Sequence, residues 1–281
     1  MFILPPPVTL NSKQLLSLLY KLPPCKSKNH NEQNKKDGRK MGVSEYRSDK
    51  YRDFLYGEGE KNTVWRFGAP PSFEVVDKLF EDGRTQVWPA GSLEEKVQNL
   101  VKTYEMEIMH KVNPADYKSM NAERITLSVN GRKATNLEET GKLQGSYNFF
   151  LQTSLPEKLR VYNPAEETAV TSHSTFTTVF PRGFALEILQ LYSGPPVIAF
   201  KFRHWGYMEG PFKGHPPTGE KIEVFGIGVF EVDEHMKIVK IEFFMDRGEL
   251  LAGVLKGGGE AAMAMLAEGS GSGCPVMKGT G

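Results

Sequence analysis

Hydrophobic and polar residues alternate along much of the C-terminal half of the chain, which is the pattern of a β-strand with one buried face. Five runs carry this pattern: 175–180, 184–192, 197–207, 221–232 and 237–246. The spacers between neighbouring runs are short and rich in Gly, Pro or acidic residues, which favours antiparallel pairing. The pattern therefore predicts a large antiparallel sheet.

Helical patterns come earlier in the chain. A Pro-Pro-Ser sequence precedes a predicted helix at 73–81. Ser92 and Glu95 then form a capping box, in which the two side chains satisfy the first free amide groups of a helix. Apolar residues recur there at three- and four-residue intervals, which predicts a helix to about residue 111. Its buried stripe consists of Val97, Leu100, Val101, Tyr104 and Ile108.

A strand and a further helix are predicted between these helices and the sheet runs. Residues 125–129 read as a strand that ends in Asn130-Gly131, a pair that accepts the positive φ of a tight turn. A second capping box, Asn136 to Glu139, predicts a helix that continues through 147–151. Helices come first and strands second, which is the α+β pattern.

Candidate chemistry lies where the strand runs end. In 197–207, Ile198, Phe200 and Phe202 share a face with His204, while Trp205 lies on the opposite face. A histidine at the end of an apolar face is either a hydrogen-bonded core residue or a functional group beside the loop that follows. Glu105 and His110, near the end of the helix at 92–111, fit either a solvated carboxylate and a histidine at the helix dipole or members of a site.

Two carboxylates share one face of the last strand run. Glu242 and Asp246 alternate there with Lys240 and Phe244, which fits either a solvated edge or a pocket with a polar end. In a pocket, burial and mutual repulsion would raise the pKa of at least one carboxylate and provide an acid or base near neutral pH.

Gly226 and Gly228 share a face of the run 221–232. They either leave open space in front of the sheet or mark a bulge or bend where the sheet curves strongly. Both interpretations are compatible, since a curved sheet also encloses a cavity.

Composition excludes several classes of protein. The net charge of +1 combines six net positive charges in residues 1–40 with five net negative charges elsewhere, so a nucleic-acid surface is not expected. No apolar run approaches the ~20 residues that span a bilayer. Cys25 and Cys274 are the only cysteines, too few for a disulfide framework or a cysteine zinc site. We expect neither a metal nor a cofactor.

The chain divides into three parts. Residues 1–44 are predicted to be a disordered basic extension, residues 45–256 a single α+β domain, and residues 257–281 a flexible tail rich in Gly, Ala and Ser. A cytoplasmic location is the expectation, and a transit peptide within residues 1–40 is the alternative.

Several motifs resemble known families. The decapeptide at 210–219, with Lys237-Ile-Val and Asp246-Arg-Gly-Glu-Leu-Leu, resembles the SnoaL-like polyketide cyclases of the nuclear transport factor 2-like fold. Between about Tyr51 and Leu255, and in the tail motif Ser-Gly-Cys-Pro-Val-Met, the chain is similar to the plant pathogen-related protein family. The matching stretches are Gly57-Glu-Gly-Glu-Lys61, Trp65-Arg66, Gly68-Ala-Pro-Pro71, Lys78-Leu-Phe80, Trp88-Pro89, Glu105-Met-Glu107, His110-Lys111 and Phe200-Lys-Phe-Arg-His-Trp-Gly-Tyr-Met-Glu-Gly210.

The resemblance implies a cone-shaped, curved antiparallel sheet that wraps a pocket closed by N-terminal helices and dimerises through its outer face. It also implies that Asp246 matches the proton-transfer Asp of the cyclases, whereas Glu242 stands where many relatives have Trp. Members of this fold include cyclases, isomerases and binding domains without catalysis, so the fold alone does not assign chemistry.

Three functions follow as hypotheses. The first is a cofactor-independent cyclase or isomerase of a small hydrophobic metabolite, with Asp246 transferring the proton and His204 or Glu242 tuning it. The second is a defence-related protein that binds such a metabolite without changing it, and the third is an adaptor whose cone is filled across Gly226 and Gly228. Ligand contacts are expected from Trp205, Tyr207, Phe200, Phe230, Phe244, Tyr104 and Tyr147.

Overall fold

The computed structural model describes residues 48–258. The predicted extension at 1–44, and all but the first two residues of the predicted tail at 257–281, lie outside the described residues. The helices are α2 (Glu74–Gly83), α3 (Leu93–His110), α4 (Leu137–Gly141), α5 (Ser146–Phe150), α6 (Ala169–Val179) and α7 (Arg247–Leu255). Short 3-10 turns lie at Glu58–Glu60, Pro114–Asp116, Glu157–Leu159, Pro164–Glu166 and Lys256–Gly258.

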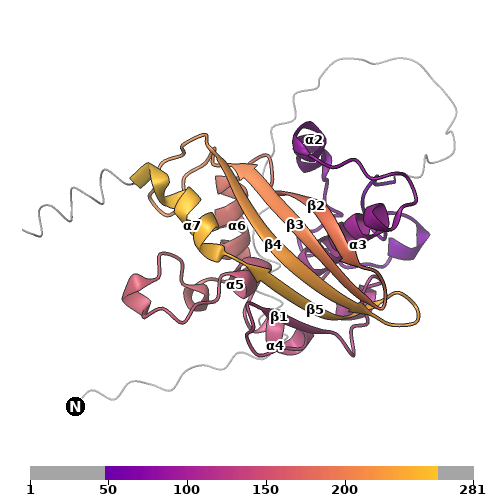
Figure 1. Ribbon diagram of the computed structural model, residues 1–281. Coiled ribbons are helices and arrows are strands. Elements are labelled where there is room, and N and C mark those ends of the chain that lie inside the picture. The colour runs from indigo at the N-terminus through magenta and orange to yellow at the C-terminus, as the bar shows by residue number, and fades with distance from the viewer. Residues whose placement is uncertain (1–47, 259–281) are drawn as a thin grey trace, which may run out of the picture. The chain divides into compact units, whose positions relative to one another are not determined.

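One open, curved sheet organises the described part of the chain (Figure 1). Its strands are β1 (Thr126–Val129), β2 (Ala185–Ser193), β3 (Val197–Tyr207), β4 (Lys221–Val232) and β5 (Ile238–Met245), in the order β1-β5-β4-β3-β2. Strands β2 to β5 pair antiparallel, as their short connections predict. The α+β class and the curved sheet are thus confirmed.

Strand β1 adds a parallel strand to the predicted antiparallel sheet. It pairs in parallel with β5, with Leu127 opposite Ile241. A short spacer would impose antiparallel pairing, but a long segment of helices and strands separates β1 from β5 in the chain. The direction of β1 is therefore free of that constraint.

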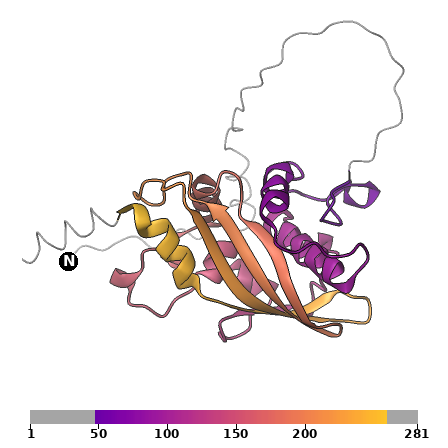
Figure 2. The same cartoon turned by 45° about the horizontal axis from the view of Figure 1, so that its top comes forward.

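Helix α3 packs on the inner face of the sheet, the face that carries Phe200, Phe202 and His204. Ser92 Oγ accepts a hydrogen bond from Glu95 N at 3.2 Å, which caps the helix start as predicted. The predicted stripe supplies Val97, Val101 and Tyr104 to the main hydrophobic core. Figure 1 and Figure 2 show α3 and α6 behind the sheet, on the same side.

The predicted helix from Asn136 to residue 151 is broken in two. The capping box is present, with Glu139 N donating to Asn136 Oδ1 at 2.9 Å, but α4 ends at Gly141. Gln144 and Gly145 have positive φ angles of 55° and 129°, so the chain turns before α5 begins. The polar and glycine residues between the two pieces interrupt the apolar stripe.

Helix α6 corrects the strand predicted at 175–180. Thr168 and Thr171 form a capping box at its start, with Thr171 N donating to Thr168 Oγ1 at 3.1 Å. The β-branched residues of this segment favour a strand by intrinsic propensity. The cap and the burial of Phe176 and Val179 on one helical face outweigh that preference.

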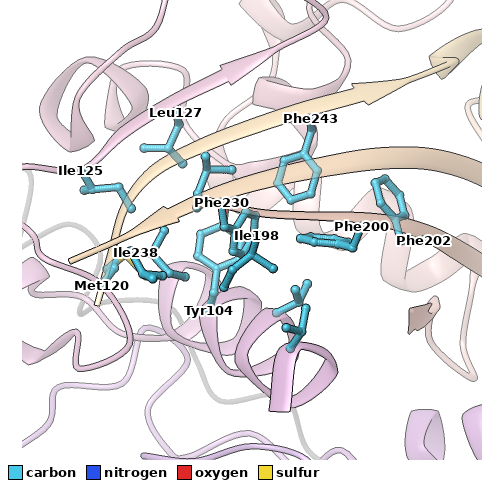
Figure 3. Packing of buried hydrophobic residues seen from close by; sticks show 14 of the residues in the cluster. Tyr104, Met120, Ile125, Leu127, Ile198, Phe200, Phe202, Phe230, Ile238 and Phe243 are labelled. Atoms are coloured by element: carbon cyan, nitrogen blue, oxygen red, sulfur yellow. The ribbon is translucent and has the colours of Figure 1, made fainter. Parts of the chain in front are cut away.

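The two glycines of β4 make room for aromatic rings. A Cβ at Gly228 would lie 2.3 Å from Phe200 Cζ, and one at Gly226 would lie 2.4 Å from Phe202 Cζ. Figure 3 shows Phe200 and Phe230 pointing to the side on which Tyr104 of α3 lies. This part of the inner face is filled, but a cavity remains elsewhere on that face, which contradicts the cone without a cavity that the adaptor hypothesis predicts.

Within residues 48–258, no helix combines the length and the apolar character needed to cross a membrane.

Candidate functional site

A cavity of ≈ 470 Å³ lies between the inner face of the sheet and helices α2, α3, α5 and α6. A neighbouring cavity of ≈ 320 Å³ extends toward α4. The two cavities share six lining residues and therefore adjoin. The shared residues are Glu105, Met109, Ser146, Tyr147, Phe150 and His173.

The cavity walls are mainly hydrophobic. Helix α3 presents Met106 and Met109, α6 presents Phe176, and the strands present Phe202 and Phe243. A predominantly apolar cavity with a few converging polar groups is the usual form of a small-molecule site.

A carboxylate and an imidazole meet inside this cavity. Glu105 Oε1 of α3 lies 3.3 Å from His204 Nε2 at the end of β3, and the two side chains are 29% and 20% exposed. The His204 ring stacks on Phe184 with centroids 5.4 Å apart and an angle of 6°. Among residues 48–258, His204 Nδ1 is buried without a hydrogen-bond partner. One nitrogen therefore faces the carboxylate, while no third side chain fixes the tautomer.

Two more histidines lie at the junction of the cavities. The His173 ring of α6 stacks on Phe67 with centroids 4.6 Å apart, and the His110 ring lies 6.2 Å from that of His173. Burial, with smaller contributions from His173, Arg66 and Arg52, lowers the pKa of His110 to about 4. Burial also lowers the pKa of His173. His110 is therefore neutral at pH 7, which overturns the interpretation of a charged histidine at the helix dipole.

This neutral histidine predicts a loss of stability in acid. The unfolded chain takes up a proton on His110 near pH 6.5 whereas the folded chain resists until about pH 4, so stability falls as pH drops between these values. The titration of His110 lowers the free energy of unfolding by about 3 kcal/mol over this pH range. His173, whose pKa is also lowered, acts in the same direction. Urea unfolding from pH 7.5 to 4 measures it.

A matched comparison isolates the effect of His110. His110→Gln is expected to flatten the decline in unfolding free energy between pH 6.5 and 4, because the titrating ring is gone. His235→Gln, which changes an exposed histidine, is expected to leave the decline as it is in the wild-type protein. Equal declines in His110→Gln and wild type would contradict the assignment.

The two carboxylates predicted from the last strand lie outside the cavity lining. Strand β5 ends at Met245, and Asp246 is the exposed N-cap of α7, with Oδ1 accepting from Gly248 N at 2.7 Å. Glu242 lies on the outer face, where it pairs with Lys240 at 2.9 Å. Strand parity places Glu242 on the outer face, and the inner face carries Phe243 and Met245 instead.

The cap gives Asp246 a measurable structural role. Asp246→Ala is expected to lower the unfolding free energy by about 1 kcal/mol, because the amide of Gly248 loses its acceptor. Asp246→Asn keeps an acceptor oxygen and is expected to cost less. Thermal unfolding of both variants provides the measurement, and equal losses would contradict a capping role.

The predicted aromatic contacts divide between cavity and core. Tyr104 and Tyr147 line the smaller cavity, and Tyr147 also lines the larger one. The Tyr147 ring stacks on that of Phe176, with ring centroids 3.9 Å apart. Phe200 and Phe230 are fully buried in the core and do not reach either lining.

The remaining predicted aromatics lie on the other side of the sheet. Trp205 is buried against Phe80 of α2, with ring centroids 6.2 Å apart. Tyr207 lies under the Arg182 guanidinium at 4.3 Å, and Phe244 is exposed on the outer face. Strand parity places all three opposite His204 or Phe243, so none of them lines the cavity.

No three or more His, Cys, Asp or Glu side chains within residues 48–258 come together in a way that could hold a metal ion.

The chain is similar to a known plant protein. It is 55% identical over 241 residues to a pathogen-related protein of barley, Hordeum vulgare, covering 85% of this chain and 99% of the barley protein. No family model matches the chain.

Solved structures give weaker likenesses. A protein from Jannaschia sp. CCS1 assigned as a SnoaL-like polyketide cyclase is 13% identical, with a TM-score of 0.33, over 60% of this chain and 97% of its own. A protein of ketosteroid isomerase-like fold from Catenulispora acidiphila, solved with trimethylamine, is 11% identical, with a TM-score of 0.32, over 55% of this chain and 91% of its own. At these scores the likenesses carry no argument about activity.

Proposed function

The chain belongs to the pathogen-related protein family, and we propose that it binds a small, largely apolar metabolite and transfers a proton on it through Glu105 and His204. The observation that carries this proposal is the 3.3 Å approach of the carboxylate and the imidazole inside an apolar cavity. The reaction class is a cyclisation or isomerisation that begins by removing a proton next to a carbonyl group.

The chemistry follows from the surroundings of the pair. Apolar walls favour an apolar ligand, since each buried CH₂ gains about 0.8 kcal/mol on leaving water. The Glu105 carboxylate accepts the proton from carbon and passes it to the His204 imidazole across their 3.3 Å contact, and the resulting imidazolium delivers a proton to oxygen or to a second carbon. The pair supplies a base and an acid together, so this proton transfer requires only side chains of the protein.

Binding without turnover is the second candidate. It is favoured by one observation, namely that His204 Nδ1 has no partner among the residues the structure describes. Catalytic histidines are commonly held in one tautomer by a group on the second nitrogen. In a binding protein, the same pair would only orient a polar group of the ligand.

Ligand retention tests the site itself. The protein is incubated with a plant metabolite extract, and bound compounds are identified by native mass spectrometry. Ser146→Trp fills the junction of the two cavities and is expected to abolish retention. Ser174→Trp changes an exposed residue of α6 and is the matched control. Retention of the same compounds by Ser146→Trp, or of none by the wild-type protein, would refute the cavity as the site.

The outer face of the sheet suggests that a second copy of the chain is the partner. Phe225 of β4 and Phe244 of β5 are 49% and 45% exposed there, and Ile227, which lies opposite Phe244, shares this face with them. Burial of this patch against its own copy would remove both rings from water on each side.

A double substitution tests this dimer. Phe225→Ser with Phe244→Ser is expected to raise the dimer dissociation constant by roughly tenfold or more, because apolar area is lost on both subunits. Val87→Ser, which changes an exposed residue elsewhere, is the control. Light scattering across a dilution series gives the constants. A wild-type monomer, or a dimer unaffected by the double change, would contradict the proposed interface.

A further inference from the structure

Lys102 is a second reactive group in the larger cavity, and proton transfer by Glu105 and His204 does not use it. It lies on α3 three residues before Glu105, so the two side chains project from neighbouring turns of one helix face. The residue is 3% exposed and lines the cavity. Within residues 48–258, its Nζ atom is buried and has no hydrogen-bond acceptor.

Aromatic rings shelter the amine. Lys102 Nζ lies 3.2 Å from the ring centroid of Phe80 and 4.2 Å from that of Tyr51. Aromatic rings attract a cation less strongly than a carboxylate or water would. Burial therefore still disfavours the charged form of Lys102. A buried lysine without an ion-pair partner costs stability, and an apolar residue would fill this space at lower cost.

The surroundings of Lys102 lower its pKa to about 7, so a large share of the amine is uncharged near neutral pH. Burial is the main cause of this lowering, and Arg52 contributes to it. Asp77 of α2, Glu105 of α3 and Asp49 in the segment before α2 raise it. Asp77 and Asp49 are themselves bound by Arg52, at 2.9 Å and 3.3 Å, which weakens their pull on the lysine. A neutral amine carries the lone pair that a nucleophile needs.

We propose that Lys102 forms a reversible imine with the carbonyl group of an aldehyde or ketone held in the cavity. This inference rests on the proposed function, because the ligand occupies the same cavity. The Nζ lone pair forms a bond to the carbonyl carbon, and the carbonyl oxygen takes up a proton. The resulting carbinolamine then loses its hydroxyl group with the second amine proton as water, and the C=N bond forms.

The neighbouring pair is placed to serve this step. Glu105 is one turn away on α3 and lies 3.3 Å from His204, so either group can hand a proton to the departing hydroxyl. The flexible four-carbon stem lets Nζ leave the rings of Phe80 and Tyr51 to meet the ligand. The substrate class is therefore a small apolar carbonyl compound.

Reductive trapping tests the imine. The full chain is incubated with benzaldehyde and sodium cyanoborohydride, which reduces an imine to a stable secondary amine, and modified lysines are located by peptide mass spectrometry. We expect Lys102 to be modified first, with a rate that rises through a midpoint near pH 7. Lys102→Met is expected to fold and to lose this modification, whereas Lys78→Met, which changes an exposed lysine of α2, is expected to keep it.

A second ligand separates the imine from the cavity. Benzyl alcohol has the same ring but no carbonyl group, and its binding is followed by isothermal titration calorimetry. The imine would be overturned, and the cavity retained, if the wild-type protein binds benzyl alcohol but shows no trapping at Lys102, and if Ser146→Trp abolishes that binding. If the wild-type protein shows neither benzyl alcohol binding nor trapping at Lys102, the cavity would be overturned as well. Trapping spread evenly over surface lysines would also overturn the imine.

Discussion

Glu105→Gln is expected to slow the exchange of α-protons on a cavity-bound ketone by roughly 10²- to 10⁴-fold, the usual contribution of a general base. Glutamine has the shape of glutamate and keeps an oxygen toward His204, so the cavity is preserved while the basic carboxylate is lost. The measurement is proton NMR of phenylacetone in D₂O with catalytic amounts of protein. Binding of phenylacetone to the variant, measured by calorimetry, is expected to stay within a few-fold of wild type.

Three comparisons make this result specific. Asp246→Asn and Glu242→Gln are expected to exchange at the wild-type rate, because both carboxylates lie outside the cavity lining. Exchange that Lys102→Met abolishes proceeds through an imine, whereas exchange that this variant keeps proceeds through Glu105 alone. Slow exchange in Asp246→Asn with a wild-type rate in Glu105→Gln would contradict the site and restore the carboxylate that the family resemblance favours.

Lys111→Met is expected to lower the free energy of unfolding by about 3 to 5 kcal/mol, as expected when one partner of a buried ion pair is removed. Lys111 Nζ is fully buried and lies 2.9 Å from Glu60 Oε2 and 2.8 Å from Glu107 Oε1. Methionine fills much the same volume but leaves two carboxylates without their shared cation. Urea unfolding measures the loss.

Glu107 explains why this network tolerates burial. Its Oε1 accepts from Lys111 Nζ and from Lys118 N at 2.9 Å, and its Oε2 accepts from Ser119 N at 2.9 Å and Ser119 Oγ at 2.6 Å. Lys118 also pairs with Glu60. With every oxygen of Glu107 bonded, the charges are held at the end of α3 and fix the segments that follow and precede it.

An exposed lysine provides the control for the buried one. Lys142 pairs with Glu138 at 3.0 Å on α4, and both side chains are largely exposed. Lys142→Met is expected to change stability by less than about 0.5 kcal/mol, because exposed pairs contribute little. A loss of less than about 1 kcal/mol in Lys111→Met would contradict the view that the network is a coupled, buried unit.

Strands β3 and β4 could be predicted to the residue from the sequence, because alternating side chains and Gly- or Pro-rich turns are local signals. Helix α6 could not, since Thr and Val favour a strand locally while its cap and the packing of Phe176 favour a helix. The parallel pairing of β1 with β5 joins segments far apart in the chain, and no spacer constrains it.

The site was predicted only in part for the same reason. Parity correctly put His204 on the inner face, and periodicity put Tyr104 on the buried stripe of α3. Glu105 was noticed but could not be paired with His204, because their contact depends on how α3 packs against the sheet. The orientation of α3 against the sheet is set by the packing of the whole core. Asp246 was favoured by a motif, and α7, which it caps, was not predicted.

A crystal structure of the protein with a compound retained from the metabolite extract tests the central claim most directly. We expect the ligand in the cavity between α3 and the inner face of the sheet, with a polar atom within hydrogen-bond distance of Glu105 or His204. A ligand bound at Asp246 or on the outer face beside Glu242, with the cavity filled by side chains, would contradict it.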